Sequence, residues 1–194
     1  MKELELENEM YVDGLLKDDI EAFCHVSEKY MYYVTKFQGI KNGYKTFNVP
    51  AFLLGGAWFA HRGLMKEAFL TDMLGWVFTG SLQVIWEMVL GKEEGGLWVA
   101  IIGMLIYAIV FGIKATPYYF GYTKTYFEKM GFLNRKPEAV SEATNQKVKE
   151  ILYEAGKTSG KRTVLHFIFF KVLGKLCWIS LWITIYAGSG VRFY

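Results

Sequence analysis

Apolar and charged stretches alternate along the chain. Charged side chains are concentrated in residues 1–46 and 114–162, and hydrophobic side chains in residues 47–60, 68–90, 97–113 and 163–187. A helix needs about 20 predominantly apolar residues to cross a bilayer, because the hydrocarbon core is about 30 Å thick. The pattern therefore predicts an all-α integral membrane protein with a water-exposed head.

Residues 1–46 have the spacing of an amphipathic helical head. Apolar side chains recur every three to four positions over residues 8–37, which is the period of one helix face or of a helix pair. Gly14 divides this stretch, and the acidic residues Asp18 and Asp19 favour a helix start because they complement the helix dipole. We expect the aromatic face that follows to pack on the membrane portion.

Residues 47–62 mark the point at which the head meets the lipid. A helix from Asn48 to Ala60 would reach only about 20 Å, which is too short to cross the hydrocarbon core. We therefore expect a re-entrant or interfacial helix, capped by Asn48 and carrying Pro50 in its first turn. Gly55 and Gly56 would allow another helix to approach closely.

Three later segments, residues 64–90, 97–113 and 163–187, are predicted to span the membrane. Residues 97–113 carry no charged side chain, and we expect this span to end at Lys114 and Pro117. The turn at residues 91–96 would make the first two spans an antiparallel hairpin. We predict a membrane domain over residues 47–187, with a polar connection at 114–162 that contains a solvated helix over 137–155, and a tail at 188–194.

Aromatic residues follow the predicted end of the second span. Tyrosine is enriched where the hydrocarbon meets the headgroups, because its ring is apolar and its hydroxyl is polar. We predict an interfacial aromatic belt that consists of Tyr118, Tyr119, Tyr122 and Tyr126. A platform for stacking a ligand is the alternative interpretation.

Basic residues are distributed unequally between the connections. The 114–162 connection is rich in Lys and Arg, whereas Lys92 is the single basic residue of the turn at 91–96. Lys and Arg are retained on the cytoplasmic side of a membrane. We expect the N-terminus and residues 114–162 to be cytoplasmic, in a multi-pass protein of a plasma (inner) membrane.

Besides Lys66 and Glu67 near the start of the first span, which we expect at the interface, the predicted spans contain four charged residues: Asp72, Glu87, Lys171 and Lys175. A charge at the bilayer centre costs about 2.5–3.5 kcal/mol on insertion scales, so it needs a partner, water or an escape to the interface. We predict an Asp72–Lys171 pair, with Lys175 one helical turn further along the same face. This group would bind an anion, a proton or a partner helix, the alternative being lysines that extend to the interface. Glu87 is expected to be hydrated.

Other functional classes lack support in the sequence. The formal charge of +3 is small, and its lysines are interleaved with acids, which argues against a nucleic-acid partner. Three histidines (His25, His61, His166) and two cysteines (Cys24, Cys177) have no metal-ligand spacing, and no nucleophile or phosphate-loop motif occurs. We therefore expect no cofactor, metal or catalytic residue.

A motif covers residues 30–62. Its members are Tyr32, Tyr33, Lys36, Phe37, Phe47, Asn48, Ala51, Phe52, Gly55, Trp58, Phe59 and Arg62. This run resembles a family of small bacterial inner-membrane proteins that is defined only as a domain of unknown function. Val49, His61 and Gly63 depart from the family's Trp, Tyr and Lys. The resemblance implies a membrane location and layout but no activity.

Three functional hypotheses follow. The favoured one is a non-catalytic scaffold or accessory subunit that binds the bilayer and a membrane-protein partner or a second copy, through its aromatic belt and small-residue faces. The alternatives are a small oligomeric transport or channel element that uses Asp72, Lys171 and Lys175, and a membrane-embedded enzyme.

Overall fold

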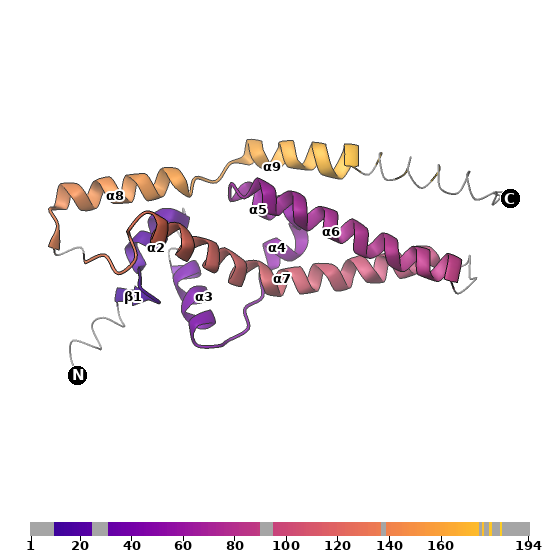
Figure 1. Ribbon diagram of the computed structural model, residues 1–194, viewed down its shortest axis with the longest axis horizontal. Coiled ribbons are helices and arrows are strands. Elements are labelled where there is room, and N and C mark those ends of the chain that lie inside the picture. The colour runs from indigo at the N-terminus through magenta and orange to yellow at the C-terminus, as the bar shows by residue number, and fades with distance from the viewer. Residues whose placement is uncertain are drawn as a thin grey trace. The chain divides into compact units, whose positions relative to one another are not determined.

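The computed structural model describes residues 10–24, 31–89, 95–136 and 139–174, together with residues 176, 179 and 183. Within these residues the chain is mostly helical (Figure 1). It divides into two units. Unit 1 comprises Met1–Leu53 and Ile102–Thr158, and unit 2 comprises Leu54–Ile101 and Ser159–Tyr194.

Unit 1 opens with a short β-hairpin. Strands β1 (Tyr11–Val12) and β2 (Leu15–Leu16) pair antiparallel, with Tyr11 opposite Leu16. Asp13 and Gly14 form the turn at φ 54° and 80°, because Asp-Gly accepts the positive φ values that a two-residue hairpin turn requires. The all-α prediction is therefore wrong here. The apolar spacing predicts a helix, but Asp-Gly at the turn favours a hairpin.

Two helices of the head follow the hairpin and provide much of the core of unit 1. Helix α2 (Lys17–Cys24) begins with Asp18 and Asp19 in its first turn, as predicted, and α3 (Met31–Lys41) follows. Their buried aromatic side chains meet those of α7 (Gly96–Lys129). The rings in this core belong to Phe23, Tyr33, Phe37, Tyr119, Phe120 and Phe127, with neighbouring centroids 4.7–6.5 Å apart.

Helix α7 does not end at Lys114 and Pro117, which corrects the prediction. It continues through Pro117 to Lys129 (Figure 1). Proline removes one backbone donor and crowds the preceding turn, which usually kinks or ends a helix. Here the turns on both sides of Pro117 are held in the core of unit 1, where Thr116 is fully buried and Tyr119 is 1% exposed.

Helix α8 (Glu142–Ala155) is the predicted polar helix, although it begins at residue 142 and not at 137. The Ser141 hydroxyl caps it by accepting a hydrogen bond from the Thr144 amide at 3.3 Å. Helix α8 packs against α2 and buries Val148 and Leu152. It is therefore amphipathic, not solvated on all sides. The loop over 156–159 leads to α9 (Gly160–His166).

The helix predicted over residues 48–60 is divided into α4 (Val49–Leu54) and α5 (Gly56–His61). Gly55 separates the two, with φ 56° and ψ −135°. Only glycine adopts this backbone conformation readily, because any Cβ would clash with the main chain. The predicted cap is confirmed, since Asn48 Oδ1 accepts a hydrogen bond from the Ala51 amide at 3.0 Å.

Unit 2 contains the first predicted span. Helix α6 (Met65–Val84) passes into a π-helical turn, η1 (Ile85–Val89), and α5 packs against both α6 and α9. Helix α9 continues as a π-helical segment, η3 (Phe167–Leu173). Much of the predicted span at 163–187 lies outside the described residues, as do Lys175, the Lys171 side chain and residues 90–94.

Two of the described helices are long and apolar enough to cross a membrane. They are Met65–Met88 and Gly96–Lys129, with mean hydropathies of 1.3 and 2.4. The most apolar windows of these helices are 22% and 17% buried, whereas the core helix of a soluble protein is mostly buried. Their large apolar side chains instead face outward, including Leu74, Ile102 and Leu105.

Candidate functional site

An acid and a histidine meet inside unit 2. Asp72 lies on α6, about 10 Å along the helix from its first residue, and His166 is the last residue of α9. His166 Nε2 and Asp72 Oδ2 are 2.8 Å apart. The imidazole side chain is fully buried and the carboxylate is 5% exposed. Hydrogen bonds to an ionised carboxylate are roughly twice as strong as those between neutral groups.

The second carboxylate oxygen of Asp72 is held by α5. The Gly56 amide donates to Asp72 Oδ1 at 3.2 Å, which ties the first turn of α5 to α6. A Cβ on Gly56 would lie 2.9 Å from Asp72 Cγ and would also collide with the Ala68 carbonyl. Glycine is therefore required here. The predicted close approach of a helix at Gly56 is confirmed, but the approaching helix is α6 of the same chain.

Polar groups of α5 and α9 also meet around His61. His61 Nδ1 lies 3.2 Å from Thr163 Oγ1, and the His61 carbonyl accepts from the Ser159 amide at 3.1 Å. Partial burial, together with the positive charges of Arg62 and Arg162, lowers the pKa of His61. The imidazole of His61 is therefore biased toward its neutral form.

The predicted Asp72–Lys171 pair stays a prediction, and among the described residues Asp72 contacts His166. The side chain of Lys171 and the whole of Lys175 lie outside those residues. Sequence reasoning considered His166 only as a metal ligand. One signal in the sequence could have identified His166 as the partner of Asp72. His166 lies near the start of the fourth apolar segment, and its predicted depth in the membrane is similar to that of Asp72.

Glu87 lies on η1, near the opposite end of the first span from Asp72. Its Oε1 accepts a hydrogen bond from Gln83 Nε2 at 2.8 Å, and its side chain is half-buried. Its expected hydration remains a prediction. Glu87 and Asp72 do not belong to one site, because about fifteen residues of continuous helix, or about 22 Å, separate them.

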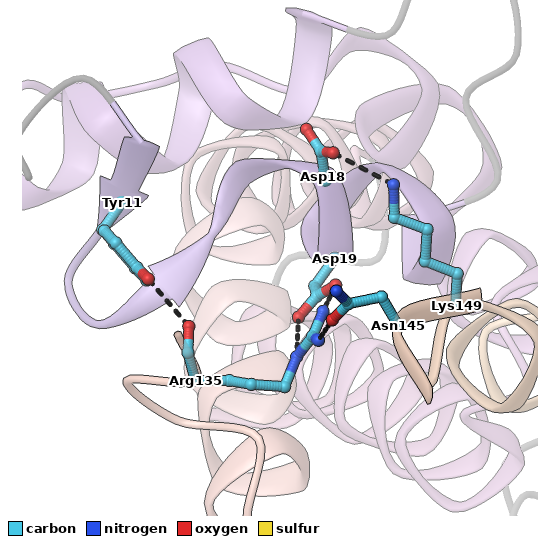
Figure 2. Close-up of polar contacts among 6 residues, drawn as sticks. All are labelled: Tyr11, Asp18, Asp19, Arg135, Asn145 and Lys149. Atoms are coloured by element: carbon cyan, nitrogen blue, oxygen red, sulfur yellow. Dashed lines mark hydrogen bonds and ion pairs between the residues drawn. The ribbon is translucent and has the colours of Figure 1, made fainter. Parts of the chain in front are cut away.

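A second polar cluster fastens the head of unit 1 (Figure 2). Arg135 donates from Nη2 and Nε to the two carboxylate oxygens of Asp19, at 2.7 and 3.1 Å. Its Nη1 donates to Asn145 Oδ1, and its carbonyl accepts from the Tyr11 hydroxyl at 2.7 Å. Arg135 thus joins β1, α2 and α8. Sequence analysis missed this cluster, since Tyr11 and Asp19 lie more than a hundred positions from Arg135.

The motif residues in unit 1 are engaged in packing. Asn48 Nδ2 donates to Thr116 Oγ1 at 3.0 Å, and the Asn48 amide donates to the Gly112 carbonyl at 2.8 Å. Phe47 and Phe52 lie over Gly112. Lys36 Nζ donates to the Phe47 carbonyl at 2.8 Å. These contacts attach the start of α4 to α7 and the residue before it to α3.

Motif residues of unit 2 are also structural. Trp58 and Phe59 are both 4% exposed in α5, and their ring centroids lie 5.3 Å apart. The Arg62 guanidinium lies over the Trp58 ring at 5.8 Å, within the range of a cation–π contact. The motif is therefore explained, in both units, by the packing of short helices onto long ones.

The residues of the predicted aromatic belt lie on different faces of α7, because of the helical period. Tyr118 and Tyr122 are 52% and 37% exposed on one face of α7, and Tyr126 is half-buried. Tyr119 is 1% exposed and packs against Tyr33 and Phe23, so its assignment to the belt is wrong. Successive helical residues are about 100° apart around the axis, which places neighbours on different faces.

Among the described residues, no cluster of three or more His, Cys, Asp or Glu side chains has the arrangement of a metal site. Comparison with protein-family models, curated proteins and solved structures gives no match to the chain. The hydrogen bonds of Asp72 to His166 and to the Gly56 amide join the three helices α6, α9 and α5.

Proposed function

We propose that this chain is a multi-pass protein of a plasma (inner) membrane that acts as a non-catalytic scaffold or accessory subunit. The observation that carries the proposal is that, within unit 1, α7 runs without a break from an exposed apolar part into the core of the head. Residues 102–113 are apolar and largely exposed, and the following turns form the aromatic core of the head. The head is thus built on the end of a membrane helix with no linker.

The first half of α7 has the properties of a lipid-facing helix. Ile102, Leu105 and Val110 are 50–56% exposed, and monomeric soluble proteins rarely expose so large a contiguous apolar surface. We propose that lipid acyl chains cover this face of α7. The short helix α4 fits an interfacial position, because it exposes Val49 and Leu53 while burying Ala51.

The proposed partner surface lies further along α7. Tyr118, Gly121, Tyr122 and Thr125 are exposed and have the i, i+3, i+4, i+7 spacing of one helix face. At about 33–44 Å from the start of α7, this tyrosine face would lie at the headgroup level or just beyond it. Tyrosine is enriched in protein interfaces, and an open glycine allows close helix approach. We propose that another membrane protein binds here.

The proposal is tested by extracting the protein gently from its native membrane and measuring the mass and subunit composition of the particle. We expect a stoichiometric foreign subunit that is lost in the Tyr118→Ala/Tyr122→Ala double variant. Tyr44→Ala is the matched control, because Tyr44 is 70% exposed and belongs to the segment between α3 and α4, not to α7. A foreign subunit retained by the double variant would exclude the tyrosine face as its binding surface.

A small transport element is the second candidate, and the buried Asp72–His166 pair favours it. Three membrane-spanning helices leave little room between them for a transport pathway, so this function would require an oligomer. A particle that contains only copies of this chain would support transport and contradict the accessory role. The resemblance to the family of unknown function supports the proposed location and layout, and adds no activity.

A further inference from the structure

We propose that the basic end of unit 2 binds the phosphate of an anionic phospholipid, whose acyl chains lie along the exposed apolar faces of α6 and α9. The basic end is the place where α5 ends and where α6 and α9 begin. Its basic side chains are Arg62, Lys66, Lys161 and Arg162. The inference rests on the proposed membrane location, and it is independent of the tyrosine face and of the partner proposed for that face.

Contacts within unit 2 bring these helix ends together. The Ser159 amide donates to the His61 carbonyl at 3.1 Å, and His61 Nδ1 lies 3.2 Å from Thr163 Oγ1. A Cβ on Gly63 would collide with Arg162 Nη1, so the Arg162 guanidinium lies against the turn between α5 and α6. Basic side chains that are distant in sequence are therefore gathered at one end of three packed helices.

Helices α6 and α9 run in the same direction from this end. Asp72 of α6 contacts His166 of α9, whereas Arg162, one turn before His166, lies at the turn that precedes α6. Lys66 precedes Asp72 by six residues, or about 9 Å, and Lys161 precedes His166 by five residues, or about 7.5 Å. The two lysines therefore lie at a similar height, on the polar side of the contact between Asp72 and His166.

The two arginines of the basic end are half-buried and lie near one imidazole. The positive charges of Arg62 and Arg162 both lower the pKa of His61, and the Arg62 guanidinium is held over the Trp58 ring at 5.8 Å. A guanidinium has five N–H donors in a planar fork that matches phosphate oxygens. Each arginine can therefore contact protein groups and still donate to a phosphate.

Positive charge is in excess at the basic end. Among the described residues of unit 2, the acid in the first turn of α6 is Glu67, and Asp72 lies further along the same helix. Lys66 and Lys161 are both exposed. Clusters of basic residues near a membrane surface attract anionic lipids, and basic pockets between membrane helices bind lipid headgroups. An anionic phosphate would balance the excess charge.

Exposed apolar side chains continue the helix face of each lysine. Leu70 follows Lys66 by four residues and is 55% exposed, and Leu165 follows Lys161 by four residues and is 60% exposed. Residues four positions apart share a helix face, and side chains tilt toward the helix N-terminus. Each lysine therefore extends away from its leucine toward the polar end. This order of charge and apolar surface fits a phospholipid better than a free phosphate ion.

Native mass spectrometry of the full chain in detergent micelles tests the lipid site. With phosphatidylglycerol and phosphatidylcholine at equal concentrations, we expect phosphatidylglycerol to bind at least about tenfold more tightly. Lys66→Gln/Lys161→Gln should reduce this preference at least about fivefold, since one basic residue near an anionic surface contributes about that factor. Both lysines are exposed, and unchanged binding of phosphatidylcholine would show that the variant is folded.

A matched control removes the same charge from the other unit. Lys129→Gln/Lys147→Gln replaces two exposed lysines of unit 1 and should keep the full preference for phosphatidylglycerol. Leu70→Ala/Leu165→Ala should weaken the binding of phosphatidylglycerol, because the acyl chains lose apolar contact. An excess of inorganic phosphate should not displace the lipid, since a free ion makes no contact with the apolar faces.

Several results would overturn the proposal. They are equal binding of the two lipids by the unsubstituted chain, a preference that survives Lys66→Gln/Lys161→Gln, and a preference that the control variant loses to the same extent. Displacement of phosphatidylglycerol by inorganic phosphate, or full binding by Leu70→Ala/Leu165→Ala, would show a site for a soluble anion instead.

Failure of the proposed function would give a different result. A chain that stays monodisperse without detergent and binds neither lipid would contradict the membrane location itself. A chain that needs detergent and binds both lipids equally would contradict the headgroup site alone. Tyr118→Ala/Tyr122→Ala should leave the lipid preference unchanged, because the tyrosine face belongs to unit 1.

Discussion

Buried polar side chains decide where the short helices attach. Asn48 is 1% exposed and makes four hydrogen bonds, two to α7 and two to amides of α4, one of which caps that helix. Asp72 similarly joins α6 to α5 and α9. A buried polar group is costly unless it is paired, so each such residue specifies one arrangement of its neighbours.

Asn48→Ala should destabilise unit 1. Loss of a helix cap costs about 0.5–2 kcal/mol, and the buried Thr116 hydroxyl also loses its donor, so we expect a total of about 2 kcal/mol. Unfolding in mild detergent would measure the change. Asn42→Ala is the control, because Asn42 is exposed and should change stability by less than about 0.5 kcal/mol. Equal losses would contradict the role of Asn48.

His61 should make the stability of unit 2 depend on pH. Its pKa is lowered in the fold by burial and by the nearby arginines, so the unfolded chain binds a proton first as the pH falls. Stability should therefore decline below about pH 6.5 and continue to decline until the folded protein also binds that proton. His61→Gln should reduce the difference in unfolding free energy between pH 7.5 and 5.5. An unchanged difference would exclude this contribution.

At the scale of elements, segments distant in sequence are fastened by different kinds of contact. In unit 1, Arg135 connects α2 to α8 through a bidentate bond to a fully buried carboxylate. In unit 2, glycine at position 56 allows α5 to touch the backbone of α6. The first contact depends on charge and the second on the lack of a side chain, so each responds to a different substitution.

Arg135→Ala should destabilise the head by about 3–5 kcal/mol, because it leaves the Asp19 carboxylate buried without a counter-charge. Lys149→Ala is a matched control. Its ion pair with Asp18 at 3.0 Å is 40% and 64% exposed, so the expected loss is below about 1 kcal/mol. Chemical unfolding of the two variants would measure both effects. A small effect of Arg135→Ala would show that the fully buried carboxylate is accommodated in another way.

Gly56→Ala and Gly121→Ala should change stability in opposite directions. An alanine at position 56 would collide with the Ala68 carbonyl and Asp72, so we expect a loss of several kcal/mol, at the high end for single substitutions. Position 121 lies within α7 with nothing within 4 Å of an added Cβ. Alanine there should stabilise the helix by about 0.5–1 kcal/mol. Thermal unfolding of both variants would check the two signs.

At the scale of the whole molecule, the chain combines an outward-facing apolar surface with a polar head. Two described helices are long and apolar enough to cross a membrane, and the second extends into the head. The proposed orientation places the head and residues 114–162 in the cytoplasm. It depends on the distribution of basic residues, because Lys and Arg are retained on that side.

Single cysteines in a background with Cys24 and Cys177 replaced by serine would test the orientation. A membrane-impermeant thiol reagent should label Lys92→Cys in intact cells or spheroplasts. It should label Asn42→Cys and Glu154→Cys only after permeabilisation, since both positions are exposed but proposed to be cytoplasmic. Labelling of position 154 in intact cells would reverse the proposed topology.

Local signals in the sequence correctly predicted several features. The apolar content of residues 64–90 and 97–113 predicted the two long helices, and Asn48 followed by Pro50 predicted a capped helix start. These features depend on a few consecutive residues and on backbone chemistry. The hairpin at Asp13-Gly14 and the break at Gly55 also have local signals in the sequence. The apolar period of these stretches predicts a helix instead and conflicts with those signals.

Only the tertiary structure decided which distant residues meet. His166 is the partner of Asp72, Arg135 is the partner of Asp19, and Pro117 lies inside a helix whose turns are held by the head. The sequence determined the mostly helical character and the two long apolar helices, because hydrophobicity and helix period are properties of short segments. Pairing depends on how those segments pack, and sequence separations of 94 and 116 residues leave no local trace of it.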